Sequence, residues 1–188
     1  LHSSVKSILD KKISNEEKLS QILTAITNSE PHSVGNLFGK DGGLYLPETG
    51  NVSWSFTIPQ DGKYVIEIEY CQASDEDGKK NTNSIERVFY INGEVPFSEA
   101  RSIVLSKIWK YEYVNGTFET DKITGNDVRP NVGAYREWTT FELKDSNGYY
   151  PNPFEFYFTQ GENTITLEGV REPVIVRSIT LRPQSSTM

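Results

Sequence analysis

Six consecutive residues near the middle of the chain combine side-chain types from which ligand sites are built. Residues 125–130 read GNDVRP, with an amide at Asn126, a carboxylate at Asp127 and a guanidinium at Arg129. Such planar polar groups form paired hydrogen bonds with polar ligands. The same side chains could instead hold a turn, in which Asp127 accepts backbone N–H groups and Arg129 ties the loop to the rest of the protein. The sequence favours this turn, because a long excursion needs anchors, but an anchored loop can still present a site.

The elements that must position this segment are strands, recognisable by alternating apolar and polar residues. Val52, Trp54, Phe56 and Ile58 alternate with serine and threonine, as expected of a half-buried strand with Trp54 in the core. Further strands are expected over 64–70, 85–91, 137–143, 154–158, 163–169 and 174–181. Asn92-Gly93 predicts a hairpin turn, residues 97–109 are ambiguous, and about 110–136 is a polar excursion. Short strands between turn residues predict a mainly β fold, an antiparallel β-sandwich and most simply a jelly roll.

The beginning of the chain has a different period. Leu19, Ile22, Leu23 and Ile26 follow the spacing of one helical face, and Ser14 with Glu17 forms a capping box before them. This narrow stripe needs a surface to pack against, while residues 28–43 have the composition of a loop. The chain is therefore divided into a helical extension and loop (1–43), a sandwich (44–183) and a linker or tail (184–188).

Charge and residue counts exclude several classes of function. The formal net charge of −7 argues against a nucleic-acid partner, and no apolar run approaches the roughly 20 residues of a membrane span. The chain has one cysteine, Cys71, and two histidines, His2 and His32, so the main body lacks the residues of a zinc site or a histidine-based catalytic pair. It also contains no phosphate-binding or dinucleotide motif. We therefore expect a protein that is not an enzyme.

Glu86 and Arg87 are charged residues inside an expected strand. Neighbouring residues of a strand point to opposite faces, so these two side chains cannot pair with each other. At least one of them is expected to be a partly buried ion whose partner lies elsewhere, such as Arg101 or Glu99.

Two phrases of the sequence resemble a known group of folds. SWSFTIPQDGKYVIEIEY (53–70) and FYFTQGENTITLEG (156–169) are similar to the paired signatures of galactose-binding-like jelly rolls, which include many bacterial carbohydrate-binding modules. Five further segments, SIERVFYINGEVPFSEAR, IWK, GNDVRP, LKDSNGYY and VREPVIV, resemble a domain attached to extracellular solute-binding proteins of bacterial ABC sugar transporters. The resemblance covers about residues 44–181. It implies a lipoprotein setting at a Gram-positive cell surface, with a neighbouring solute-binding domain or a permease as partner.

The chain departs from the sugar-module pattern where those modules often hold a structural calcium ion. Arg177 stands near the position at which the resemblance implies an acidic ligand, and calcium requires hard oxygen ligands. Asp75 and Asp77, before Gly78, could mimic a calcium loop, but no distal glutamate completes it, which favours a solvated turn. We therefore expect no cofactor, and these departures argue against a structural calcium ion.

A sugar site needs an aromatic face for the apolar side of the ring and planar polar groups for its hydroxyls. The sequence predicts a ligand site built from Trp109, Tyr111, Asn126, Asp127, Arg129, Arg136, Trp138, Tyr149 and Tyr150. Trp138 opens a strand and could equally be part of the core rim. The leading hypothesis is a non-catalytic domain that binds an oligosaccharide or polysaccharide. The alternative is a structural docking domain that packs against the solute-binding protein or permease and binds no free sugar.

Overall fold

The computed structural model describes residues 30–73, 83–113 and 116–184, and all structural statements below concern these residues. The predicted helical stripe between Leu19 and Ile26 and the acidic pair Asp75 and Asp77 lie outside the described residues. In chain order the elements are β1 (His32–Val34), β2 (Gly43–Leu46), β3 (Asn51–Ile58), β4 (Gly62–Gln72), β5 (Ile85–Ile91), η1 (Ser98–Arg101), β6 (Ile103–Leu105), β7 (Ile108–Glu112), β8 (Glu119–Thr120), β9 (Asp127–Val128), β10 (Asn131–Tyr135), β11 (Thr139–Glu142), β12 (Glu155–Phe158), β13 (Gly161–Arg171) and β14 (Val174–Pro183).

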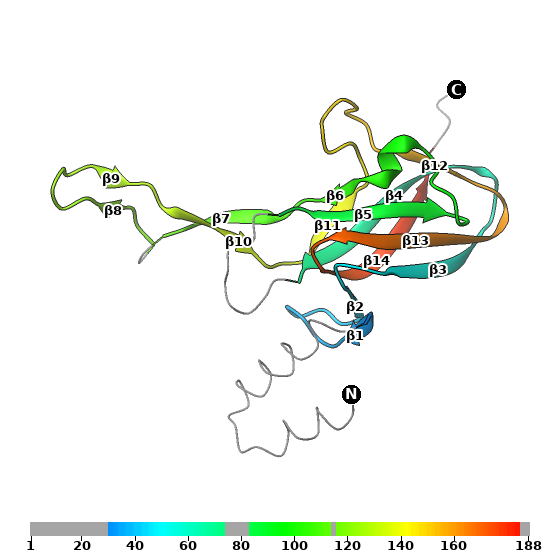
Figure 1. Cartoon of the computed structure of the whole chain (residues 1–188), viewed down its shortest axis with the longest axis horizontal. Coiled ribbons are helices and arrows are strands. Elements are labelled where there is room, and N and C mark those ends of the chain that lie inside the picture. Colours follow the sequence, from blue (N-terminus) through cyan, green and yellow to red (C-terminus); the bar gives the residue numbers. More distant parts are fainter. Residues whose placement is uncertain (1–29, 74–82, 114–115, 185–188) are drawn as a thin grey trace, which may run out of the picture.

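Two antiparallel sheets pack face to face and form a β-sandwich, which confirms the predicted fold class (Figure 1). One sheet has the order β1-β2-β14-β4-β11, with β12 also paired to β4, and the other has the order β3-β13-β5-β6. Alternate residues of each sheet point inward, as the sequence pattern predicts. Ile66 and Ile68 of β4 meet Phe89 of β5 and Ile165 of β13 in one buried cluster.

A second, smaller cluster lies on the outer face of the first sheet. Tyr45, Cys71, Ala73 and Ile175 are buried there, and Trp138 packs against them. Part of the cover is the hairpin of β1 and β2, in which His32 pairs with Tyr45 and the two rings stack with centroids 4.8 Å apart. The prediction of an uninterrupted loop before Leu44 is thus wrong at His32–Val34. A three-residue edge strand carries too few residues to show a period of two.

The segment 110–136, predicted as a long loop tied to the sandwich, has a different structure. β7 pairs with β10 over five residues of each strand, and β8 pairs with β9 further out. These four strands form a two-stranded ribbon, residues 108–135, that projects from one end of the sandwich (Figure 1). We refer to this segment as the ribbon.

The Asn92-Gly93 turn forms as predicted, but it does not lead directly into the partner strand. Both residues have positive φ, and Ile91 and Glu94 exchange two backbone hydrogen bonds across the turn. The chain then passes through η1 before β6 returns to pair with Ile85–Arg87. In the described part of the chain, no helix is long and apolar enough to cross a membrane.

Candidate functional site

The structure distributes the nine predicted site residues over three places. The ribbon carries Trp109, Tyr111, Asn126, Asp127 and Arg129, the segment between β10 and β11 carries Arg136 and Trp138, and the loop between β11 and β12 carries Tyr149 and Tyr150. The nine residues therefore belong to three separate parts of the structure.

One face of the ribbon is aromatic. The alternation along β7 puts Trp109 and Tyr111 on the same side, and both side chains are exposed. Their cross-strand neighbours on β10 are Ala134 and Val132. Tyr113 continues this row, and its ring lies 6.1 Å from that of Tyr111 and 5.3 Å from that of Phe118, measured between centroids. The outer half of the ribbon thus presents a row of aromatic rings in tilted and edge-to-face contact to solvent.

A hollow of about 380 Å³ lies beside these rings. Its walls are formed by Tyr111, Tyr113, Phe118, Asp127, Val128, Arg129 and Pro130. Within the described segments, neither the Asp127 carboxylate nor the Arg129 guanidinium has a hydrogen-bond or ion-pair partner. The hollow therefore combines an apolar wall with one unpaired acid and one unpaired base.

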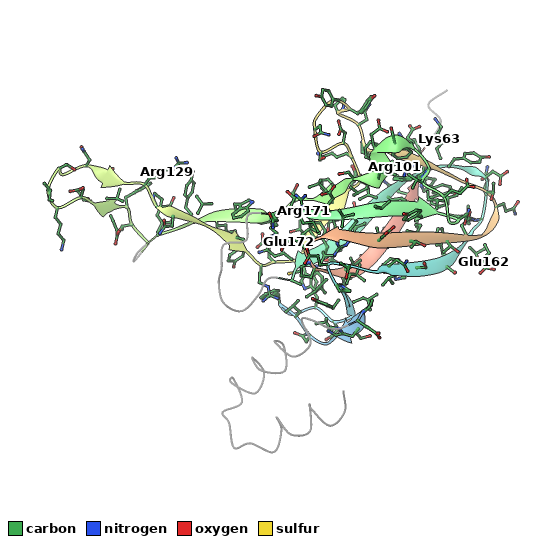
Figure 2. The ribbon with its side chains drawn as sticks, in the orientation of Figure 1. Lys63, Arg101, Arg129, Glu162, Arg171 and Glu172 are labelled. Atoms are coloured by element: carbon green, nitrogen blue, oxygen red, sulfur yellow. The ribbon has the colours of Figure 1, made fainter. Side chains whose placement is uncertain are left out.

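The GNDVRP segment does not anchor the ribbon to the sandwich. Figure 2 shows Arg129 on the outer part of the ribbon, away from both sheets, so the predicted tie through Arg129 is wrong. The Asx turn is made by Asp121 instead, whose Oδ1 accepts from the backbone N–H of Ile123 at 2.7 Å and of Thr124 at 3.0 Å. These two hydrogen bonds lower the pKa of Asp121. The pairing of β7 with β10, two strands far apart in the sequence, holds this segment in place. From the sequence, that role is expected of Asp127.

Asn126 supports the same turn. Its carbonyl oxygen accepts from the Asp121 N–H at 2.8 Å, and its own N–H donates to the Thr124 hydroxyl at 3.4 Å. On the opposite face of the ribbon, the Lys110 ammonium lies 3.6 Å from the ring centroid of Tyr135 and 3.3 Å from the Glu137 carboxylate. Asn126 thus shapes the ribbon tip and lies outside the hollow.

Arg136 and Trp138 hold the β1–β2 hairpin against the first sheet. The Trp138 indole N–H donates to the Leu37 carbonyl at 2.7 Å, and its ring packs on the second cluster. The Nε of Arg136 donates to the Gln72 carbonyl at 3.3 Å, and its guanidinium lies over the Phe38 ring. Of the two alternatives for Trp138, the structure places it at the core rim.

The third surface is the segment from Leu143 to Phe154, which we call the tyrosine loop. The Phe154 N–H donates to the Leu143 carbonyl at 2.8 Å, and Lys144 and Pro153 form an isolated backbone β-bridge. These contacts close the loop at its base. Within it, Gly148 adopts a φ of +76°, a conformation that glycine takes without strain. Tyr149 and Tyr150 project from this closed loop with 79% and 57% of their surface exposed.

Asp145 fixes the backbone on which the two tyrosines stand. Its Oδ1 accepts from Asn147 N–H at 3.0 Å, and its Oδ2 accepts from Tyr149 N–H at 2.7 Å and from Tyr150 N–H at 3.3 Å. The backbone hydrogen bonds, that of Asn147 first, lower the pKa of Asp145 although burial opposes them. The sequence analysis did not select Asp145, yet its position three residues before Gly148 is a turn signal.

The sandwich itself contains a further hollow and a cluster of charged side chains. A hollow of about 410 Å³ lies between β3 and β14. Trp54, Phe56 and apolar residues of β13 and β14 form most of its lining, and these side chains also belong to the hydrophobic core. Near the rim of this hollow, Arg177 and Lys40 both form ion pairs with Glu69. Two cations thus surround the Glu69 carboxylate. In the described residues no cluster of three or more metal-ligating side chains occurs.

Comparisons with known proteins find structural similarity to solved chains but no matching family model. A scan against models of protein families matches none of them, and a search of curated proteins finds no similar sequence. Among solved structures, the chain is similar to one described as "Crystal structure of Podospora anserina GH26-CBM35 beta-(1,4)- mannanase", with a TM-score of 0.49 and 10% sequence identity. The match covers 85% of this chain and 26% of the mannanase chain, so this chain spans about a quarter of that protein. At this level of similarity, the assignment of a ligand has to rest on the site itself.

Proposed function

We propose that this protein is a non-catalytic carbohydrate-binding domain whose sugar-contacting surface is the tyrosine loop. The observation that carries the proposal is the arrangement of Tyr149 and Tyr150 on a loop whose backbone is fixed by Asp145. Exposed aromatic rings offer an apolar face to a pyranose, and their hydroxyl groups remain available for hydrogen bonds. Because the loop is already ordered, little conformational entropy is lost when a ligand binds.

Polar groups for the sugar hydroxyls are present on the same loop. The side-chain amides of Asn147 and Asn152 are exposed, and neither has a hydrogen-bond partner among the described residues. An amide offers a donor and an acceptor in one plane, which suits two neighbouring hydroxyls. The ribbon hollow is less suitable for a neutral sugar, because most of its lining is apolar and its polar groups are two opposite charges.

Docking on another protein is a second candidate function, and the ribbon is the observation that favours it. Eight of the thirteen exposed large hydrophobic side chains of the described residues lie on this one ribbon. Concentrated exposed apolar groups of this kind, rich in tyrosine, mark protein interfaces. The two functions use different surfaces and are compatible.

The wider setting remains part of the proposal and is supported by the sequence resemblance alone. In that setting the domain belongs to an extracellular lipoprotein anchored to a Gram-positive cell surface, and it accompanies the solute-binding protein of an ABC sugar transporter. Its neighbours would be the solute-binding domain or the permease. Sequencing of the gene on both sides of this segment tests the setting, because a two-lobed solute-binding domain encoded next to it is required.

The sugar site is tested by isothermal titration calorimetry against a panel of neutral and acidic oligosaccharides. Binding of at least one of them is expected, and a Tyr149→Ala/Tyr150→Ala variant should bind it at least about tenfold more weakly. Tyr157→Ala is the matched control, since Tyr157 is exposed on β12 outside the loop. The proposal is wrong if no member of the panel binds at about 1 mM, or if the double variant binds as tightly as the native chain.

A further inference from the structure

The aromatic face of the ribbon is exposed on a part of the chain that lies away from both sheets. A two-stranded hairpin is at best marginally stable in water by itself, and this one extends away from both sheets (Figure 1). Among the described residues, β8 in the outer half of the ribbon pairs with β9 and with no strand of either sheet. Closer to the sandwich, β7 pairs with β10 in the same way. A partner that covers Tyr111, Tyr113 and Phe118 would therefore stabilise the ribbon and would also remove the exposed rings from water.

The charges in the hollow indicate what could cover it. Asp127 and Arg129 are two residues apart and line the same hollow, and in the described segments neither has a partner. An interface that buries them must supply a base opposite Asp127 and an acid opposite Arg129, since an unpaired buried charge is costly. A second copy of the same hollow, rotated by 180°, supplies both groups at once.

We propose that the ribbon is a self-association surface that binds the ribbon of a second copy of this chain about a two-fold axis. Arg129 of each copy faces Asp127 of the other, and the rings of Tyr111, Tyr113 and Phe118 pack between them. Such an isologous contact requires one patch to be complementary to itself. The aromatic rings meet this condition because like packs on like, and the adjacent opposite charges meet it reciprocally.

The overall charge of the molecule is compatible with this contact. Each chain carries a formal net charge of −7, so two copies repel each other, but the ribbon contains four acidic and three basic residues and is nearly neutral. Because the ribbon projects from one end, two ribbons can meet while the sandwiches remain apart (Figure 1). The inference names a partner for the docking surface and does not depend on sugar binding by the tyrosine loop, which lies on a different segment.

The experiment measures the mass of the full chain by sedimentation velocity over a range of concentrations. The native chain is expected to form a dimer reversibly, with a dissociation constant that rises with salt because charges contribute. Asp127→Arg gives a hollow with two cations, and Arg129→Asp gives one with two anions. Each variant should dimerise at least about tenfold more weakly than the native chain.

Mixing the two variants provides the decisive control. A chain with Asp127→Arg should form a heterodimer with a chain carrying Arg129→Asp, although neither dimerises well alone, and this recovery excludes misfolding as the cause. The chain with both substitutions exchanges the charges and should again form a homodimer. A native chain that stays monomeric at about 1 mM overturns the proposal. Dimers that the single variants leave unchanged overturn it too, as does a monomeric chain whose ribbon binds a separately produced solute-binding domain.

Discussion

The buried guanidinium of Arg87 donates a hydrogen bond to the backbone carbonyl of Glu172 at 2.7 Å. It also donates to the carbonyl oxygens of Glu86, Arg171 and Pro47 at 3.0, 3.3 and 3.2 Å. One side chain thus joins β5 to the turn between β13 and β14 and to the segment after β2. Burial lowers the pKa of Arg87 to about 10, which leaves it charged at neutral pH.

Replacement of Arg87 is expected to be strongly destabilising. Arg87→Met keeps much of the side-chain volume but removes the donor of four buried or partly buried hydrogen bonds, so the free energy of unfolding should fall by about 3–5 kcal/mol. Urea denaturation followed by fluorescence measures this change. Arg101→Met is the control at an exposed arginine, where a change within about 0.5 kcal/mol is expected. Equal effects of the two substitutions would contradict this role for Arg87.

Gly169 is expected to tolerate no side chain. A Cβ at this position would lie 2.3 Å from the carbonyl oxygen of Glu48 and 3.1 Å from that of Pro47, and these backbone atoms cannot rotate away. Gly169→Ala should therefore lower the free energy of unfolding by about 1–3 kcal/mol. At Gly35 nothing lies within 4 Å of an added Cβ, so Gly35→Ala should have almost no effect. Similar denaturation midpoints for the two variants would show that the segment after β2 moves freely.

Glu69 should contribute to the acid sensitivity of the fold. Its side chain forms ion pairs with Lys40 and, at 2.5 Å, with Arg177. The hydrogen bond from Lys40 and, after it, that from Arg177 lower the pKa of Glu69 against the opposing effect of burial. A lowered pKa in the folded state means that the stabilisation is complete above the ordinary value of about 4.3 and is lost as the pH falls through the lowered value.

The variant Glu69→Gln separates this contribution from others. The native chain should be more stable than the variant by about 1 kcal/mol at pH 7, a small value because Lys40 and Arg177 are partly exposed. The difference should shrink as the pH falls below about 4. Glu67→Gln, two residues away on β4, is the control, since Glu67 has no ion pair among the described residues. If the difference in stability between the native chain and Glu69→Gln does not change with pH, the ionisation of Glu69 is not its cause.

The strands of the sandwich could be predicted because burial on one face imposes a period of two. Val52, Trp54, Phe56 and Ile58 show it in the sequence and point inward in the structure. The ribbon also alternates, with Trp109 and Tyr111 against Lys110, but both of its faces are exposed, so the segment has the composition of a polar loop. The pairing of β7 with β10 joins residues that are 19 to 27 positions apart in the sequence, which local patterns do not reveal.

The candidate site was predictable in its residue types and only partly in its arrangement. The sequence identified the aromatic residues at Tyr111, Tyr149 and Tyr150, and all three are exposed. It could not show that the tyrosine loop and the ribbon are separate surfaces, because that depends on where the chain leaves the sheets. The sequence suggested Arg101 or Glu99 as the ionic partner of Glu86 or Arg87, whereas Glu86 lies 3.9 Å from the Arg171 guanidinium and backbone carbonyls bind Arg87.

The order of the tyrosine loop should depend on Asp145. Asp145→Ala removes the acceptor of three backbone N–H groups, so the amides of Asn147, Tyr149 and Tyr150 should exchange with solvent at least about tenfold faster. Affinity for sugar should fall in parallel. The variant loop has to become ordered when sugar binds and then loses conformational entropy, whereas the native loop is already ordered before binding. Hydrogen exchange by NMR and calorimetry on the same samples measure both effects.

The pH dependence of the same loop follows from Asp145. The backbone hydrogen bonds lower the pKa of its carboxyl group, so loop order and sugar affinity should be constant above the ordinary aspartate pKa of about 4 and decrease as the carboxyl is protonated below it. Asp61→Ala is a matched control, because Asp61 accepts the Gln160 N–H in a turn elsewhere in the sandwich. It should speed exchange at Gln160 and leave sugar binding unchanged. If Asp145→Ala speeds exchange at the tyrosines while the affinity stays at the native value, the order of the loop is not what makes it bind.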